Sequence, residues 1–277
     1  MNKLDLNRRV QITKALCEGN SLRSTARMTG VSINTVVKLL TDLGSACLDY
    51  QDKVMRNLTC QKLQCDEIWS FVYSKAKNVP AEHEGQFGYG DVWTFVAIDA
   101  DTKITPSWHV GARDADNAFE FINDLKGRLT NRVQLTTDGH KMYLTAVENA
   151  FGSEVDFAQL VKLYGETVEG QKRYSPAECT GTVKTVIQGK PDMSKVSTSY
   201  IERQNLTMRM SMRRFTRLTN AFSKKLENHM YALALYFFHY NFIRTHKSLA
   251  NPYPKTPAMA AGVTNRIWSF EDVIGLL

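Results

Sequence analysis

Periodic hydrophobic positions divide the chain into a helical N-terminal part and a longer part that mixes strands and helices. Residues 5–43 predict three helices, with a break at Gly19 and with Ser21 and Ser32 as N-caps of the second and third. In the third helix, apolar residues recur at helical spacing and are expected to face inward: Ile33, Val36, Val37, Leu40 and Leu43. Three polar residues are left for its outer face: Asn34, Thr35 and Lys38.

The spacing of small residues around the second helix is typical of a helix-turn-helix. Ala26 lets two helices cross closely, Gly30 suits a left-handed turn, and Val36 anchors the helix that follows. Such a unit places its second helix in the major groove of DNA. A three-helix bundle used for packing or dimerisation is the alternative. Because the spacing coincides with a polar outer face, we favour a DNA-binding domain over residues 1–50, with a connector over 51–62.

Beyond residue 62 the pattern changes to that of strands. Alternating or β-branched runs predict five strands, over residues 63–73, 91–102, 103–111, 132–140 and 155–162. Apolar residues at helical spacing predict helices over 114–129 and 141–150. This order predicts an α/β fold with a mixed five-stranded sheet and flanking helices, and it matches the ribonuclease H-like fold. Residues 163–198 are expected to form a long loop or insertion.

Hydropathy and cysteine content exclude several classes of protein. The longest apolar stretch, residues 230–243, is shorter than the roughly 20 residues that span a bilayer, so it predicts a buried helix. The polar N-terminus lacks the apolar core of a signal peptide, and we expect a cytoplasmic protein with no membrane partner. The five cysteines show neither a disulfide framework nor zinc-ligand spacing.

Two aspartates occupy strand positions that need an explanation. Asp66 lies inside the first predicted strand and Asp138 ends the fourth, and these two strands can be neighbours in such a sheet. A carboxylate in an apolar strand is costly to bury without a partner or a cation. Two simpler readings stay open at this point. Asp138 precedes Gly139 as in many turns, and Asp66 is compatible with a solvent-facing position from which Glu67 points the other way.

Glu202 also has two interpretations. Ser199 and Glu202 have the spacing of a capping box, which would explain the glutamate as a helix cap. The same helix presents Glu202, Asn205 and Arg209 at spacings i, i+3 and i+7, so one face carries a carboxylate, an amide and a cation. The second pattern is typical of a functional face.

Positive charge is concentrated in one region of the chain. Residues 203–255 hold ten Lys and Arg residues against a single acid, Glu227, in a protein whose net charge is +7. A basic block of this kind suggests a surface for a polyanion, although a solvated helix face is the alternative. Five side chains in it are candidate DNA contacts: Arg203, Asn205, Arg213, Arg214 and Arg217.

Four blocks of sequence resemble the DDE transposases of bacterial insertion sequences, nearest to the insertion sequence one (IS-one) family. The blocks come in family order over roughly residues 63–245 and read CDEIWSFV, WTFVAIDADTKI, TTDGHKMY and SYIERQNLTMRMSMRRFTRLTNAFSKKLENHMYALALYFFHYNF. The resemblance implies a catalytic domain over residues 63–250, followed by a tail over 251–277. It also implies a nucleoid-associated enzyme that cleaves and joins DNA strands at the ends of a mobile element.

The resemblance further implies roles for individual residues. Asp66, Asp138 and Glu202 match the catalytic triad, and Arg209 matches a basic residue on the glutamate helix. The triad would bind two Mg²⁺ ions, for which Mn²⁺ can substitute, and the partners would be double-stranded DNA and further copies of the chain, as a dimer or larger homo-oligomer. Two other functions stay open: a domesticated, non-catalytic DNA-binding regulator, and a ribonuclease H-like nuclease that cuts without joining.

Overall fold

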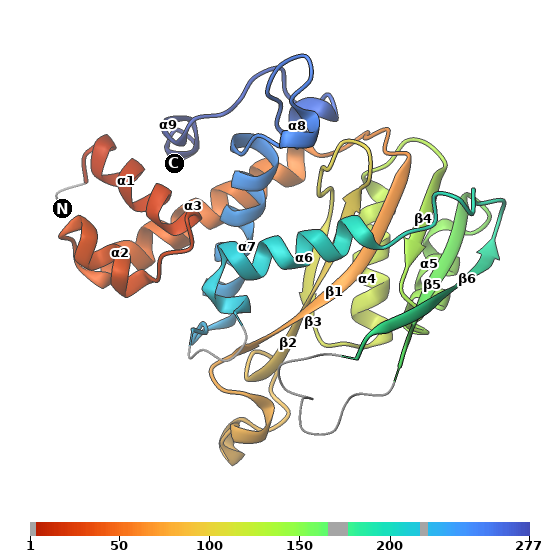
Figure 1. The fold of residues 1–277 in the computed structure, drawn as a ribbon. Helices are drawn as coiled ribbons and strands as arrows, with labels where there is room; N and C mark the ends of the chain where they lie inside the picture. Colours follow the sequence, from red (N-terminus) through yellow and green to blue (C-terminus); the bar gives the residue numbers. More distant parts are fainter. Residues whose placement is uncertain (1–3, 166–176, 217–220) are drawn as a thin grey trace.

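A computed structural model describes residues 4–165, 177–216 and 221–277 of the protein (Figure 1). These residues form an α/β structure in which a mixed six-stranded sheet adjoins a helical N-terminal part. The strands are β1 (Lys62–Val72), β2 (Gly90–Asp99), β3 (Trp108–Gly111), β4 (Val133–Thr137), β5 (Val155–Tyr164) and β6 (Cys179–Gln188). Nine α-helices lie in the described part of the chain: α1 (Leu6–Cys17), α2 (Leu22–Thr29), α3 (Ile33–Val54), α4 (Ala115–Gly127), α5 (Met142–Phe151), α6 (Ser199–Ser211), α7 (Leu226–Phe238), α8 (Pro257–Ala260) and α9 (Phe270–Ile274).

The strands lie in the order β3-β2-β1-β4-β5-β6. β1, β4 and β5 run parallel, whereas β2, β3 and β6 are antiparallel to the strands that they adjoin. The first five strands of this order are compatible with the ribonuclease H-like fold. The predicted contact between the first and fourth strands is confirmed, because Leu63 of β1 pairs with Leu135 of β4.

Two strand predictions were wrong in detail. Residues 163–198 are not simply a loop, because β6 forms within them and makes the sheet six-stranded. The third strand begins at Trp108 instead of residue 103. The backbone groups of Thr105 bind a side chain instead of a strand. The amide of Asn241 donates to the Thr105 carbonyl at 3.1 Å and accepts from its N–H at 3.0 Å. Pro106 has no N–H to offer a neighbouring strand.

The N-terminal helices begin where their capping residues predict. Ser21 and Ser32 accept hydrogen bonds from backbone N–H groups in the first turns of α2 and α3, and Gly30 adopts a left-handed conformation with φ of 66°. Val36, Leu40 and Leu43 are buried as predicted, and Val37 is half-buried. Ile33 is 40% exposed, contrary to prediction. It is the first residue of the helix and lies at the edge of the core.

α3 does not end near residue 43 but continues to Val54 and packs along α7. The prediction that residues 230–243 form a buried helix is confirmed, since they lie in α7 and in the π-helical turn His239–Ile243 that follows it. At the crossing, a Cβ added to Gly44 would lie 2.3 Å from Cβ of Tyr231. The helical part and the sheet therefore share one hydrophobic core.

The C-terminal residues return to the same helices. Trp268 packs against Tyr50 of α3 and Phe238 of α7, with ring centroids 4.8 and 5.3 Å apart, and α9 lies against α1 (Figure 1). In the described ranges, no single helix is both long and apolar enough to cross a membrane. Only α2 and α3 taken together, across a bend of 115°, reach that length and composition.

Replacing Gly44 with Ala should destabilise the protein, because the new methyl group would overlap the backbone and Cβ of Tyr231. We expect a loss of ~1–3 kcal/mol in the free energy of unfolding, the usual cost of overpacking. Gly127→Ala is the matched control, since its Cβ would meet only the end of Arg56 at 3.8 Å. Thermal unfolding measures both variants, and equal melting temperatures would show that α3 and α7 do not cross at Gly44.

Candidate active site

The register of β1 and β4 places two acidic residues next to each other. Cys65 of β1 pairs with Thr137 of β4. Asp66 follows Cys65 and Asp138 follows Thr137, so the two aspartates lie side by side. One carboxylate oxygen from each of Asp66, Glu67 and Asp138 lies within 4.8 Å of the other two. The structure thus brings together the two aspartates that are 72 positions apart in the sequence.

The surroundings of Asp66 disfavour its charged form. Burial is the largest influence, followed by the negative charges of Glu67 and Asp138, and a hydrogen bond from the N–H of Glu67 opposes them only in part. Together they raise the pKa of Asp66 from 3.8 to about 7. No cation of the described residues is among the influences on Asp66, so the penalty on its charged form is not offset by a positive side chain.

Helix α6 is fixed to β1 by two polar side chains of the strand. The Oε1 atom of Gln64 accepts hydrogen bonds from the N–H groups of Tyr200 and Ile201, at 2.9 and 3.1 Å. Two residues along the same face of β1, Asp66 accepts a hydrogen bond of 2.8 Å from Nδ2 of Asn205. Gln64 therefore caps the helix in place of a local residue, and Asn205 orients the Asp66 carboxylate.

Glu202 does not form the capping box that its spacing with Ser199 permits. The N-cap of α6 is Thr198, without a side-chain capping bond. One carboxylate oxygen of Glu202 accepts a 2.5 Å hydrogen bond from the Thr198 hydroxyl, and the other lies 2.5 Å from Nζ of Lys162 on β5. Helix capping is thus wrong as an explanation of Glu202.

The predicted triad is only partly assembled. Glu202 is near enough for its charge to raise the pKa of Asp66. The group of three close carboxylates contains Glu67 as its third member and does not contain Glu202. Arg209, on the same helix, is half-buried. Lys162 gave no signal in the sequence, because it lies 40 residues before its partner on a different element.

Glu67 points to the opposite face of the sheet, as strand alternation requires. Nε of Arg113 donates to Oε1 at 2.7 Å, and the Tyr143 hydroxyl donates to Oε2 at 2.9 Å. The Glu67 side chain is only 1% exposed, and the guanidinium of Arg113 also lies 4.6 Å from the ring of Trp93. Both oxygens of Glu67 are thus engaged, and its charge is balanced by Arg113.

The residues around Asp66 fit a divalent cation such as Mg²⁺. Carboxylate and amide oxygens are the ligands that this ion prefers, and Asp66 and Asp138 supply the charged ones. Asn205 is only 4% exposed, and its Oδ1 atom is buried without a hydrogen-bond partner. A buried, unpaired acceptor beside an unbalanced carboxylate is a feature that a bound cation would explain.

The predicted DNA-contacting residues of α6 and its continuation have different environments. Arg203 and Arg213 are exposed. Arg214 is partly buried, and its Nε donates to Oγ of Ser223 at 2.7 Å. Asn205 is buried on the side of α6 that faces β1, where its amide binds Asp66. Arg217 lies outside the described residues.

The three polar residues predicted on the outer face of α3 have different local partners. Asn34 is exposed. The hydroxyl of Thr35 lies 2.8 Å from that of Ser32, the N-cap residue. Lys38 forms an exposed ion pair of 2.6 Å with Asp42, one turn further along the helix.

Comparison of the chain with protein-family models and with curated proteins gives no match. The chemistry of the site is therefore inferred from its own residues. Sequence reasoning identified the two aspartates and Glu202 but missed Gln64. Its position two residues before Asp66 on an alternating strand was the available signal.

Replacing Gln64 with Met should destabilise the protein, because it removes the acceptor for two N–H groups at the start of α6 while keeping a similar volume. We expect a loss of ~1–3 kcal/mol in the free energy of unfolding. Gln61→Met is the control, since the Gln61 side chain is exposed and donates a local hydrogen bond to the carbonyl of Thr59. Chemical denaturation measures both, and equal effects would mean that Gln64 does not fix α6.

The raised pKa of Asp66 predicts a dependence of stability on pH in the absence of divalent cations. The folded pKa is about 7 and the ordinary value is 3.8, so the native state keeps a proton that the unfolded chain releases between these values. The stability contributed by this group is full below pH 3.8 and is lost as the pH rises through about 7. Melting temperatures in EDTA should therefore fall from about pH 5 to about pH 8 more steeply for the wild type than for Asp66→Asn.

Mg²⁺ should restore the melting temperature of the wild type near pH 8, because the ion binds the charged form of the native site. Asp66→Asn should respond much less. Glu120→Gln removes an exposed carboxylate on α4 and should behave as the wild type. If wild type and Asp66→Asn follow parallel curves with and without Mg²⁺, Asp66 is neither strained by its neighbours nor a ligand.

Proposed function

We propose that the protein is a DDE-type transposase, which binds the ends of a mobile DNA element and catalyses metal-dependent strand cleavage and strand transfer. The observation that carries the proposal is the placement of Asp66 on β1 and of Asp138 directly after the parallel neighbour β4, with the helix that presents Glu202 bound to Asp66. This arrangement lies in a sheet compatible with the ribonuclease H-like fold. It therefore agrees with the family that the sequence blocks resemble.

Each residue of the site has a part in the proposed reaction. Bound at Asp66 and Asp138, Mg²⁺ would supply Lewis-acid stabilisation of the phosphodiester and lower the pKa of the attacking hydroxyl or water. Asn205 holds the Asp66 carboxylate in one orientation through its 2.8 Å hydrogen bond. Glu67 anchors β1 on the opposite face by its bonds to Arg113 and Tyr143.

The ion pair of Glu202 and Lys162 is suited to exchange. The two side chains are 40% and 30% exposed, and pairs with this accessibility contribute only ~0–1 kcal/mol. A DNA phosphate can compete for Lys162, and the released carboxylate of Glu202 then faces the acidic pair. Glu202 would in this way complete the donor set only when substrate is present.

The N-terminal helices support a DNA-binding role. α2 and α3 meet at a bend of 115°, across a short turn that contains the left-handed Gly30. This geometry is typical of a helix-turn-helix, in which the second helix enters the major groove. Asn34 lies exposed in the first turn of α3, where side chains reach base edges. We therefore assign element-end recognition to residues 1–50.

A non-catalytic regulator would need the N-terminal helices but not the acidic pair. Burying Asp66 beside Glu67 and Asp138 costs stability, and that cost has no compensation in a protein that only binds DNA. A nuclease that cuts without joining would use the same residues. The products of the reaction distinguish it from a transposase.

The proposal is tested by incubating the protein and four variants with a plasmid that carries its own flanking DNA, in Mg²⁺ or Mn²⁺. Asp66→Asn and Glu202→Gln should lower strand cleavage by ~100-fold or more, since each removes a charged donor oxygen. Lys162→Gln should stay within a few-fold of the wild type, because it removes only the competing partner of Glu202. Glu120→Gln, on the exposed side of α4, serves as the control.

Mapping of 3′ ends and joined products completes the test. Joined strands are the expected result, and nicked DNA without joining would identify a nuclease. Normal cleavage by Asp66→Asn would refute the proposed site altogether. Equal, small effects of Glu202→Gln and Lys162→Gln would mean that Glu202 serves only the ion pair.

A further inference from the structure

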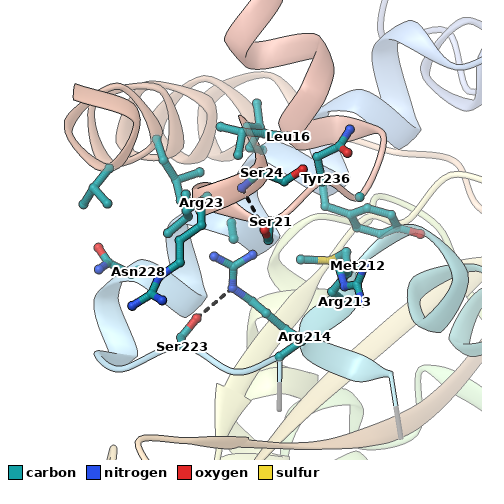
Figure 2. A pocket seen from close by; sticks show the side chains of 18 of the residues that line it. Leu16, Ser21, Arg23, Ser24, Met212, Arg213, Arg214, Ser223, Asn228 and Tyr236 are labelled. Carbon is teal, nitrogen blue, oxygen red and sulfur yellow. Dashed lines mark hydrogen bonds between the residues drawn. The ribbon is translucent and has the colours of Figure 1, made fainter. Parts of the chain in front are cut away.

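A cavity of about 890 Å³ lies between the N-terminal helices and the catalytic part of the protein (Figure 2). One wall is formed by the end of α1, the turn between α1 and α2, α2 itself and the first part of α3. The other is formed by the end of α6, the 3₁₀ turn Arg213–Phe215, residues 221–224 and α7. It is separate from the acidic site, and no step of the proposed reaction uses it.

All the charged side chains among the described residues that line the cavity are cationic. Five cationic side chains contribute to its walls: Arg23, Arg27, Arg213, Arg214 and Lys224. No Asp or Glu stands among the described residues that line it. Like charges around one cavity repel one another, and the repulsion is least screened at Arg214, since the other four cations are exposed to water. An anion in the cavity would remove this cost.

Arg214 is the most enclosed of these cations. Nε donates to Oγ of Ser223, and no carboxylate of the described part of the chain pairs with the guanidinium. Burial lowers the pKa of Arg214 to about 10, so the group stays charged at neutral pH. Figure 2 shows the guanidinium pointing towards Ser21, at the start of α2, while Arg23 extends from α2 along the same cavity.

The start of α2 adds backbone donors to the same space. The first turn of this eight-residue helix contains no acidic residue, and Ser21 caps it by accepting from the N–H of Ser24. The preceding N–H groups of a first turn have no partner inside the helix, and the helix dipole makes this end positive. Helix N-termini that face arginine side chains are common phosphate sites.

We propose that the cavity is a phosphate-binding site, and that its ligand is a backbone phosphate of a DNA strand that passes between the N-terminal helices and the catalytic part. The guanidinium of Arg214 and the first turn of α2 bind the phosphate oxygens from opposite walls. Arg23, Arg27, Arg213 and Lys224 supply the surrounding positive charge. The phosphate chemistry follows from the cavity itself, whereas its assignment to DNA rests on the proposed function.

Helix α6 connects this cavity to the acidic site. A Cβ on Gly19 would lie 2.8 Å from the carbonyl oxygen of Ser211, so the α1–α2 turn abuts the end of α6. From Glu202 to Ser211 the helix rises ~14 Å, at 1.5 Å per residue. That length corresponds to roughly four base steps along a DNA strand, at 3.4 Å each. A single strand can therefore reach the acidic site and the cavity together.

The first test uses inorganic phosphate as the probe, in EDTA and at constant ionic strength against chloride. Phosphate well above its Kd should raise the melting temperature of the wild type by roughly 3–8 °C. Arg214→Gln should lose most of this shift. Because Arg214 is partly buried, the double change of exposed Arg23 and Arg27 to Gln provides a second variant that does not disturb packing. Lys53→Gln removes an exposed charge outside the cavity and should respond as the wild type.

The second test identifies the source of the phosphate. Binding of a short fluorescent DNA duplex is measured in EDTA, with phosphate or with chloride at equal ionic strength. Phosphate should weaken DNA binding several-fold in the wild type and in Lys53→Gln, but not in Arg214→Gln or in the Arg23 and Arg27 double variant. Glu120→Gln, which removes an exposed charge on α4, should behave as the wild type.

The outcomes separate the two parts of the inference from each other and from the proposed function. A phosphate shift that the cavity variants lose, together with competition against DNA, supports the proposal. A shift without competition would overturn the assignment to DNA and leave a site for a free phosphate compound. Absence of a phosphate shift in the wild type, or a full shift in both cavity variants, would overturn the site itself. None of these results depends on whether Asp66 supports cleavage.

Discussion

The attachment of α6 to β1 is the constraint on which the candidate active site depends. A helix N-terminus leaves backbone N–H groups without partners, and here Gln64 of the sheet supplies the acceptor that the local sequence does not. The same strand face holds Asp66, which receives the amide of Asn205. Two polar contacts, five residues apart on the helix, fix both its position along the strand and its rotation. Glu202 faces β5 and the acidic pair as a consequence.

The two adjacent acids of β1 have different hydrogen-bond and charge partners, and this difference distinguishes the face of the sheet that carries the candidate site. Glu67 is buried, but a guanidinium and a phenol hydroxyl bind its two oxygens. Asp66 receives two neutral hydrogen bonds and no cation of the described residues, beside the like charge of Asp138. A structural carboxylate is neutralised where it is buried, as Glu67 is. The charged form of Asp66 has no such partner among the described residues, which is the basis for the proposed metal site.

Close backbone contacts join the N-terminal helices to the rest of the chain. Gly44 brings α3 against Tyr231 of α7, and Gly19 brings the α1–α2 turn against Ser211 of α6. Both positions exclude a side chain, so the surfaces meet directly. The cavity with its five cations lies beside these contacts, and its walls come from both parts of the chain. The N-terminal helices and the acidic site at the sheet are therefore linked through α6.

Local periodicity determined most of the secondary structure between residues 63 and 162, the caps at Ser21 and Ser32, and the meeting of Asp66 with Asp138. These features follow from strand alternation, helix capping and strand order, each of which can be recognised from residues that are close in the sequence. β6 escaped prediction because it is an edge strand whose residues are mostly exposed, which leaves no one-sided hydrophobic pattern. The partners of Glu202 and of the α6 N-terminus lie 40 and 136 residues away, at Lys162 and Gln64. Only the packed structure decides such pairs, because they depend on which faces of distant elements meet and not on any local pattern.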